Sequence, residues 1–599
     1  MKLPAWLISF GTLSLFVAAE SLQVDDASSD NHDHSDSKQH WHLKGPTSTS
    51  KREDNQDTKE ALADQIHVLP GWTKTIPSRM FSGYVDAGTS EENGTHYTMH
   101  EHYFFVESEG DPMRDPLIIW TNGGPGASSM FGLFVELGPF YLSGDSFFTP
   151  YAEETGIPEL FRNEHSWSKL ANLLIINSPP PIGYSYCDPV GPTGDGYSCG
   201  TWNDTKTAYH NRIYLESFFE RFPKFKNSDI YVIGESYAGV YVPTLVREIL
   251  DQTEDSDNAA MDGQKWMIKN SLKGFAVGDA CMGTKNVCGK DGPGPLLNLE
   301  FMRGHGQFSE KLYRDVFKKC SMEDLIGFRE GDGNNFDYFN GGITDKTCLD
   351  HLKKIENATG PYYIYHLYDA CWYQNDLEPP HNSLTQKRDY FSSVPPFHNK
   401  VAEDSKKPDK LTATRGARHG QRTTPVSSTG KLSLSGAVND YPCGGNAAFF
   451  EWVMKPQVKQ ALHVEHGAIF FSGDNGVGFT YNTTEPDLMP FYYRVVTETD
   501  LRVLVYNGDA DPAINSFTAQ NWTSHLGVEE IEPWRPWTID GKEYIGGYVT
   551  RYENKFDFLS IRAAGHMVPQ YKPKVTFEFL ERWLNNEPWK EWRGGNDNE

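Results

Sequence analysis

Short apolar runs, each ending at a turn residue or a polar residue, recur along the chain and predict buried strands. They lie in PLIIWTNGGPG (116–126), ANLLIINSPPP (171–181), DIYVIGES (229–236), LKGFAVGDA (272–280), LRVLVYNGDAD (501–511) and FDFLSIRAAGH (556–566). Stretches of helical character separate several of them, for example 208–221 and 455–464. Apolar strands that alternate with helices predict an α/β fold, with a mostly parallel sheet and helices on both faces.

The strand rhythm stops between 281 and 441, where 312–320 and 348–355 have helical character. We interpret 281–398 as an inserted, largely helical cap. Residues 399–440 contain KKPDKL, RGARHGQR and TTPVSSTGKLS, which are polar and low in complexity, and predict an exposed insert. The sheet-forming core then comprises 67–280 and 441–599.

The first residues, MKLPAWLISFGTLSLFVAAES, have one lysine, an apolar stretch and small residues before Glu20, which is typical of a signal peptide over 1–19. Residues 20–66 contain few apolar side chains and predict a pro-segment or disordered tail, with a processing site at Lys51-Arg52. Its four histidines could bind a metal, but we favour a solvated tail: His32, His34, His40 and His42. We predict no metal site and no cofactor.

Charge and composition narrow the possible partners. The 599 residues include 55 Lys and Arg and 81 Asp and Glu, a formal charge of −26, which argues against nucleic acid or an anionic membrane as a partner. No stretch after the signal peptide approaches the roughly 18 apolar residues of a membrane span. We therefore expect a soluble protein of the secretory route, either extracellular or vacuolar/lysosomal, and its oligomeric state stays open.

Eight cysteines in a chain that enters an oxidising compartment indicate disulfides. Closing each cysteine on its nearest neighbour predicts four pairs: Cys187–Cys199, Cys281–Cys288, Cys320–Cys348 and Cys371–Cys443. Glycosylation sequons fit the same route and predict surface positions at Asn93, Asn203, Asn357, Asn482 and Asn521.

Ser236 follows the strand of DIYVIGESYAGVYVP directly, and helix-like sequence comes next. A turn that lifts a serine hydroxyl above a sheet edge needs small residues two positions before and after the serine, and Gly234 and Ala238 meet this need. Glycine is usual at both places, so an ordinary strand-to-helix turn is the alternative interpretation.

Polar residues of catalytic type gather at the carboxyl ends of the predicted strands, where ligands of parallel sheets bind. They are Asn122, Ser236, Asp509, Asp511 and His566. Serine needs a base, and the base needs an orienting acid; the order Ser, Asp, His along the chain is that of the α/β-hydrolase fold. The pattern itself leaves Asp509 and Asp511 as alternative acids.

Five ordered motifs resemble the serine carboxypeptidase family: WTNGGPGASS (120–129), FGLFVELGPF (131–140), GESYAG (234–239), YNGDAD (506–511) and AAGHMVP (563–569). The match extends from about Leu69 to Leu584. The resemblance implies Ser236 as nucleophile, Asp511 as orienting acid and His566 as base.

The resemblance further implies Gly124 and Tyr237 as donors of the oxyanion hole. It also implies a sub-site for the terminal carboxylate of the substrate, which is made by Asn122 and Glu235 with Glu136 and Trp120 in the same hydrogen-bond network. Crowded acids raise one another's pKa, so the two glutamates can share a proton below neutral pH.

Two residues depart from the family pattern. Ala127 replaces a usual cysteine, so Cys443 must pair elsewhere or stay free, and Pro181 replaces a usual glycine near the cleft.

We expect a serine-type carboxypeptidase that releases C-terminal residues from peptides and proteins through an acyl-enzyme, favoured at acidic pH. A serine carboxypeptidase-like acyltransferase and a non-catalytic protective or binding partner are the alternatives. A metallocarboxypeptidase is disfavoured, because the chain contains no H-x-x-E pair.

Overall fold

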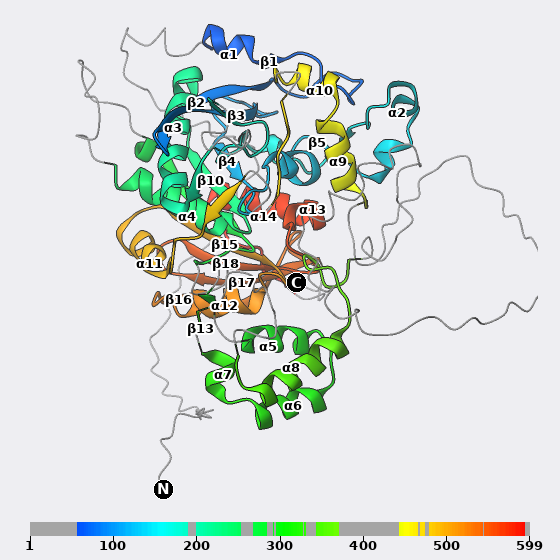
Figure 1. Cartoon of the computed structure of the whole chain (residues 1–599), viewed down its shortest axis with the longest axis vertical. Coiled ribbons are helices and arrows are strands. Elements are labelled where there is room, and N and C mark those ends of the chain that lie inside the picture. The colour runs from blue at the N-terminus through cyan, green and yellow to red at the C-terminus, as the bar shows by residue number, and fades with distance from the viewer. Residues whose placement is uncertain are drawn as a thin grey trace, which may run out of the picture. The chain divides into compact units, whose positions relative to one another are not determined.

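The structure is a computed structural model of the whole chain, drawn in Figure 1. It describes residues 57–189, 199–252, 268–283, 291–292, 295–327, 329–330, 343–369, 442–464, 468–473, 479–542 and 544–593. The predicted signal peptide, the low-complexity insert and most of the predicted pro-segment lie outside these ranges, as do the four histidines of the tail.

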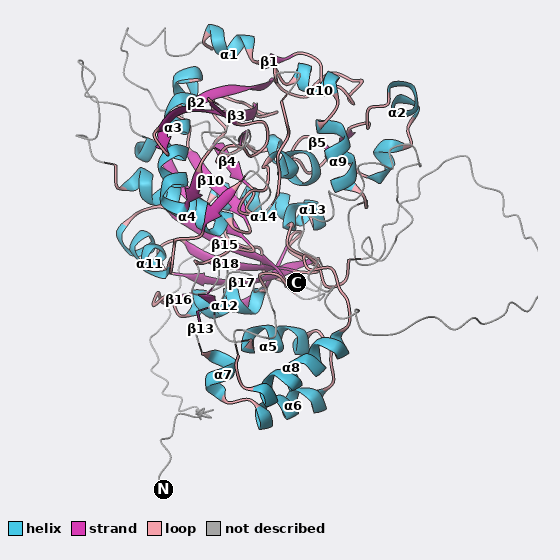
Figure 2. Ribbon diagram, viewed as in Figure 1, coloured by secondary structure: helices cyan, strands magenta, loops and turns pink. Residues whose placement is uncertain are grey.

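The centre of the fold is a run of parallel strands, drawn in magenta in Figure 2. In spatial order they are β7 (Asn172–Ile176), β4 (Leu117–Thr121), β10 (Ile230–Glu235), β11 (Leu272–Gly278), β15 (Arg502–Gly508) and β18 (Phe556–Ile561), and each pair of neighbours is parallel. These are the six apolar runs of the sequence, so their prediction as buried strands is confirmed. Because all six are parallel, their carboxyl ends lie along one edge of the sheet.

Antiparallel strands that the sequence analysis did not predict extend this centre to a 12-stranded sheet within the described residues. One side adds β3 (Thr95–Val106), β2 (Met80–Glu92) and β1 (Gln65–Ile66), with β8 (Tyr186–Asp188) paired to β3; the other adds β17 (Ile545–Tyr552) and β16 (Glu530–Thr538). The sheet is therefore parallel at its centre and antiparallel at its margins.

Two apolar cores cover the two faces of the sheet, and alternate strand residues enter alternate cores. Val232 lies in the first core and Ile233 in the second, as the two-residue period of a strand requires. The first core receives side chains from α3 (Asp204–Arg221), α4 (Ala238–Leu250), α11 (Met489–Glu498) and α12 (Ser516–Ser524). The second receives them from the π-helical turn η1 (Gly132–Leu137) and from α9 (Gly445–Val453), α10 (Pro456–Ala461), α13 (Val568–Tyr571) and α14 (Pro573–Asn585). Helices on both faces are thus confirmed.

Helices also occupy the predicted cap, and are coloured green in Figure 1: α5 (Leu296–Gly304), α6 (Glu310–Lys319), α7 (Met322–Ile326) and α8 (Lys346–Thr359). Leu299, Val316, Leu325 and Leu352 pack together in a small core of their own. The boundaries proposed for the cap and for the low-complexity insert stay predictions.

The remaining elements are short. They are α1 (Lys59–Ala63), β5 (Phe140–Tyr141), η2 (Gly144–Phe147), α2 (Pro150–Thr155), β6 (Phe161–Arg162), η3 (Trp167–Lys169), β9 (Thr201–Asn203), η4 (Pro223–Phe225), η5 (Ile268–Asn270), β12 (Asp291–Gly292), β13 (Arg329–Glu330) and β14 (Thr480–Asn482). Within the described ranges, no helix has the length and apolar character that crossing a membrane requires.

The folded chain begins earlier than the predicted tail boundary at residue 66. α1 buries Ala61, β1 pairs with β2, and Asp57 forms ion pairs with Arg79 and Lys224. These contacts order a segment whose composition alone is polar, so residues 57–66 belong to the fold.

Two of the four predicted disulfides, Cys187–Cys199 and Cys320–Cys348, are present in the structure. Cys281 and Cys443 are also disulfide-bonded, so the possibility that Cys443 stays free is wrong. Their predicted partners, Cys288 and Cys371, lie outside the described residues, and those two pairings stay predictions.

The sequon asparagines are exposed at Asn93, Asn357, Asn482 and Asn521. Asn203 is half-buried and caps α3 by accepting from Lys206 N at 2.9 Å. Glycosylation at all five positions stays a prediction.

Candidate active site

Ser236 lies on a tight turn between β10 and α4 with φ +65°, in the left-handed region that a non-glycine residue rarely adopts. A Cβ added at Gly234 would come within 2.5 Å of Thr121 O, and one at Gly239 within 2.3 Å of Cys281 O. The turn therefore needs its small residues. Ser236 is half-buried, which leaves its hydroxyl within reach of a substrate.

Backbone bonds hold the turn from both sides. Ser236 N donates to Gly278 O at 2.9 Å, and Ser236 O accepts from Gly239 N at 2.9 Å and Cys281 N at 3.0 Å. These bonds fix the strained residue to the neighbouring β11 and to its own helix. The local geometry is that of a nucleophile elbow rather than of a relaxed turn.

His566 and Asp511 form a buried pair at the same edge of the sheet. His566 Nδ1 lies 2.8 Å from Asp511 Oδ2, and the side chains are 4% and 0% exposed. Asp511 also accepts from Ala513 N at 2.8 Å and Ile514 N at 3.2 Å, which fixes its carboxylate. His566 Nε2 has no hydrogen-bond partner in the described part of the chain, so this nitrogen is available to a serine hydroxyl.

Asp509, the alternative acid, has a different set of contacts. Its Oδ1 accepts from Ala563 N at 2.6 Å and so ties the loop after β15 to the loop after β18. Between the two aspartates that the sequence pattern left open, only Asp511 is bonded to the imidazole.

The loop after β4 packs tightly against the residue that follows Ser236. A Cβ added at Gly123 would lie 2.3 Å from Tyr237 N, and Gly124 has φ +113°. Neither Gly124 N–H nor Tyr237 N–H donates to another group within the described ranges. Two unpaired backbone donors beside a nucleophile are what a developing oxyanion requires.

The predicted carboxylate sub-site forms one buried hydrogen-bond network. Asn122 Nδ2 donates to Glu235 Oε1 at 2.8 Å and to Glu136 Oε1 at 3.1 Å, while Asn122 Oδ1 accepts from Trp120 Nε1 at 2.8 Å. Exposed fractions are 4% or less for all four residues. The structure thus brings together every residue that the sequence analysis assigned to this sub-site.

The two glutamates of the network carry strongly perturbed pKa values. Burial raises the pKa of Glu136 to about 7, and burial followed by the charge of Glu136 raises the pKa of Glu235 well above its usual range. Each accepts from Asn122 Nδ2 through its Oε1, and Glu136 Oε2 and Glu235 Oε2 have no hydrogen-bond partner in the described part of the chain, so two ionised carboxylates here would repel each other without compensation. Near pH 5 the pair therefore carries at least one proton.

Three residues at the site were not found from the sequence. The Tyr365 ring lies 4.8 Å from the His566 ring, and Tyr365 O accepts from His566 N at 2.8 Å. Asp204 accepts from the Tyr237 hydroxyl at 2.8 Å and so fixes the side chain that follows the nucleophile. Asp279 lies beside Asp511 and His566. Asp279 follows the strand in LKGFAVGDA, so it could have been found as a polar residue at the carboxyl end of a predicted strand, as Ser236 was. Tyr365 and Asp204 do not follow a predicted strand.

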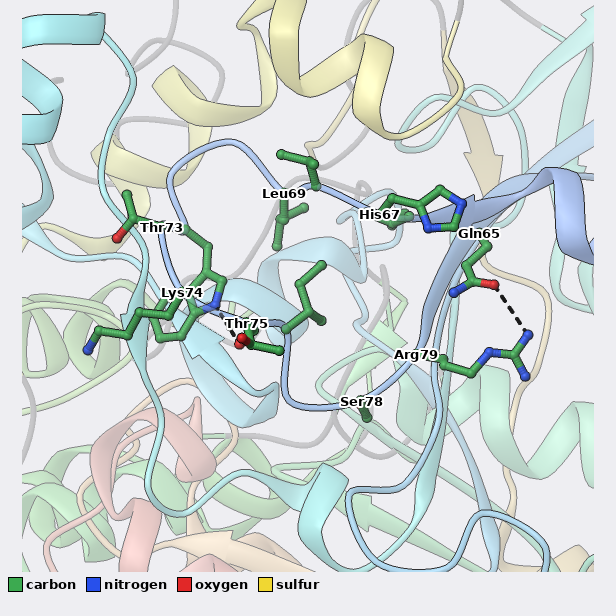
Figure 3. A pocket seen from close by; sticks show the side chains of 12 residues that line it. Gln65, His67, Leu69, Thr73, Lys74, Thr75, Ser78 and Arg79 are labelled. Carbon is green, nitrogen blue, oxygen red and sulfur yellow. Dashed lines mark hydrogen bonds between the residues drawn. The ribbon is translucent and has the colours of Figure 1, made fainter.

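A pocket of about 600 Å³ lies elsewhere, against the segment that leads into β2. Figure 3 shows its lining, including Lys74 and Arg79, with a hydrogen bond from Arg79 to Gln65. None of the predicted site residues lines it. We therefore place the candidate active site at the strand ends and not in this pocket.

Comparison with known proteins follows the same motifs. The family model described as serine carboxypeptidase matches residues 70–586. The chain belongs to the serine carboxypeptidase family. The enzyme class expected from the motifs is thereby confirmed.

Curated relatives agree with the family model. Serine carboxypeptidase 1 of Hordeum vulgare is 30% identical over 521 residues, which cover 87% of this chain and 92% of the relative. The lysosomal protective protein of Mus musculus is 27% identical over 532 residues, which cover 88% and 94%. The match thus spans nearly all of each relative.

Among solved structures, the prohormone-processing carboxypeptidase Kex1(ΔP) of Saccharomyces cerevisiae aligns with a TM-score of 0.57 at 18% identity, covering 88% of this chain and 96% of that chain. This likeness confirms the predicted α/β-hydrolase fold.

Proposed function

We propose that this protein is a serine carboxypeptidase that releases residues one at a time from the C-terminus of peptides and proteins. The observation that carries the proposal is the position of the carboxylate sub-site. Glu235, which bonds to Asn122, directly precedes Ser236, so a terminal carboxylate held there lies about one residue from the nucleophile. Such a site selects a peptide bond next to a free C-terminus, and an endopeptidase does not have this requirement.

Hydrolysis proceeds in two halves on the same residues. Ser236 Oγ attacks the carbonyl carbon of the last peptide bond while His566 Nε2 takes its proton, and Asp511 holds the imidazole in the required tautomer. Gly124 and Tyr237 N–H groups stabilise the oxyanion. The C–N bond then breaks, His566 returns the proton to the leaving amine, and the acyl group stays on Ser236.

The second half uses water as the nucleophile. His566 takes a proton from water, the hydroxide attacks the acyl ester, and the shortened peptide leaves as Ser236 regains its proton. An acceptor other than water at this step would make the enzyme an acyltransferase. The proposal is therefore also that water is the acceptor of the acyl group.

Substrate recognition depends on the shared proton. With Glu136 and Glu235 carrying a proton between them, the network offers Asn122 Nδ2 and a carboxyl O–H to the terminal carboxylate of the substrate. Loss of that proton leaves three negative groups in one buried place. This favours activity at acidic pH, and it fits a destination in an acidic organelle or outside the cell.

The test uses one N-blocked peptide followed over time by mass spectrometry. The proposal predicts stepwise loss of C-terminal residues, and slower loss at acidic pH from the same peptide with a C-terminal amide, which offers no carboxylate to the sub-site. Ser236→Ala serves as the inactive control. Internal cleavage, or transfer of the acyl group to an added alcohol in preference to water, would overturn the proposal.

A further inference from the structure

Asp279 is a second buried acid beside the catalytic aspartate. It follows β11, which lies between β10, the strand of the nucleophile, and β15, the strand of the acid. Its side chain is 0% exposed, its φ is +44°, and its carboxyl group offers an oxygen within 4.8 Å of the corresponding side-chain atoms of Asp511 and His566. The fold therefore places two carboxyl groups and one imidazole in a single dry cluster.

The neighbours of Asp279 do not balance a negative charge. Asp279 Oδ1 accepts from Asn507 Nδ2 and Gly508 N, both at 3.0 Å, and Asp279 Oδ2 accepts only a longer bond of 3.3 Å from Gly508 N. No lysine or arginine pairs with it in the described part of the chain. The titratable groups that face it from the surrounding elements are Glu235, Tyr506, Asp511 and His566.

Two ionised carboxylates in contact inside a dry site repel strongly, so one of them keeps a proton. Asp511 already accepts from three donors, His566 Nδ1, Ala513 N and Ile514 N, whereas Asp279 accepts only from Asn507 Nδ2 and Gly508 N. Burial, and then the charge of Asp511, raises the pKa of Asp279 well above its usual range. The proton is therefore assigned to Asp279.

We propose that Asp279 is a positioning residue of the triad, which stays protonated and donates a hydrogen bond to Asp511. This inference rests on the proposed function, because it assigns a role beside the same nucleophile and base. The donated bond holds the Asp511 carboxylate in place and withdraws negative charge from it. A weaker negative field at the imidazole lets His566 stay neutral at a lower pH, which a base must do in an enzyme that works in acid.

The test compares Asp279→Asn with Asp279→Leu. The readouts are kcat for a C-terminally blocked ester and the acid limb of the pH profile, which is measured both as kcat/KM for that ester and as the rate at which a phosphonofluoridate labels Ser236. Asparagine keeps a donor for Asp511 and adds no charge, so we expect its acid limb within about 0.3 pH units of the wild type. Leucine removes the donor, so the limb should move to higher pH and kcat should fall about tenfold to a hundredfold.

Two results would overturn the proposal. If Asp279 were ionised, Asp279→Asn would remove a negative charge beside His566 and move the acid limb down by about one pH unit or more. If Asp279→Leu folds and keeps both the limb and kcat, the residue does not position the triad. If Asp279→Leu does not fold, the limb of Asp279→Asn decides alone.

The control is Asp557→Asn on β18, where a buried carboxylate bonds instead to Arg551 and Trp589. Its acid limb should not move. A wild-type protein whose Ser236 is labelled but which releases no C-terminal residue would contradict the proposed function and leave the labelling test of Asp279 intact.

Discussion

Asn122 Nδ2 donates to Glu235 Oε1 at 2.8 Å, and Glu235 is the residue directly before Ser236. The residue proposed to bind the substrate carboxylate and the residue proposed to attack the substrate are thus neighbours in the chain. Any movement of the Glu235 side chain acts on the turn that holds the nucleophile, and any change of charge on Glu235 is felt beside the reacting carbon. We therefore expect the charge state of Glu235 and its partner Glu136 to be the main cause of the pH dependence of peptide cleavage.

The nucleophile can be identified chemically. A phosphonofluoridate should label Ser236 and abolish activity, because His566 Nε2 is available to take the hydroxyl proton. EDTA should have no effect, since His566 Nδ1 and Asp511 are bonded to each other. Peptide mapping of the labelled protein locates the adduct. Activity that is lost with EDTA, with no serine labelled, contradicts the triad.

The two aspartates of GDAD should differ in their effect on turnover. Asp511→Asn should lower kcat on the order of 10⁴-fold, because an amide NH2 that faces His566 Nδ1 donates where the carboxylate accepts, and so selects the wrong tautomer. Asp509→Asn should act on the loops that it joins, through its bond from Ala563 N, and change stability more than chemistry. Steady-state kinetics and thermal unfolding of both variants separate the two effects. A folded Asp509→Asn protein with the larger loss of kcat would reverse the assignment.

The strands, and the positions of Ser236 and His566 at strand ends, could be predicted because their signals are local. Ile, Val and Leu runs that end in a polar residue identify both a buried strand and its carboxyl end, which is how Ser236 and His566 were found. β3 was missed because Glu101 and His102 interrupt its apolar run, although both are fully buried. Tyr365 lies in the predicted cap and contacts His566 of the core. The spacing of apolar residues along the sequence does not predict a contact between segments so far apart.

The pattern of strands and polar residues could not decide between Asp509 and Asp511 as the orienting acid. Both aspartates follow the same strand, and only the path of the loop after β18 decides which of them meets the imidazole. The family resemblance supplied that choice, because strand periodicity says nothing about a loop.

Cys281 should be bonded to Cys288. Cys281 N already donates to Ser236 O, so its backbone lies under the nucleophile turn. Peptide mapping without reduction should find both cysteines in one short linked pair. Linkage of either residue to a distant cysteine would refute the pairing.

Glu101 should make the protein less stable as the pH rises. Burial raises the pKa of Glu101 to about 8, so between about pH 4.5 and 8 the folded state binds a proton that the unfolded state does not. Stability from this proton is present at pH 4.5 and is lost as the pH approaches 8. Glu101→Gln should therefore shrink the loss of unfolding free energy between pH 5 and 7.5 by on the order of 1–3 kcal/mol.

Denaturant unfolding at the two pH values measures the effect of Glu101→Gln, and the exposed Glu153→Gln on α2 is the control. An equal pH dependence in the wild type and in Glu101→Gln would show that Glu101 is ionised in the folded protein.

Asn122→Ala should damage peptide cleavage much more than ester cleavage. Its amide donates to both glutamates, and in the proposed complex it contacts the terminal carboxylate, which a blocked ester lacks. We expect a rise in KM for the peptide and little change for the blocked ester. Trp120→Phe removes the indole N–H that Asn122 Oδ1 accepts and also shrinks a fully buried side chain, so its thermal unfolding is measured beside its kinetics.

The most direct test of the account compares two pH profiles of the wild-type protein, one for a peptide with a free C-terminal carboxylate and one for the matching ester with that carboxylate blocked. Burial raises the pKa of Glu136 to about 7, so the pair gains a negative charge as the pH passes neutrality, and this charge repels the carboxylate of the substrate. We predict that peptide hydrolysis falls above that pH through a rising KM, while ester hydrolysis continues to higher pH. Superimposable profiles for the two substrates, with KM for the peptide unchanged across neutrality, would contradict the carboxylate sub-site and the proposal built on it.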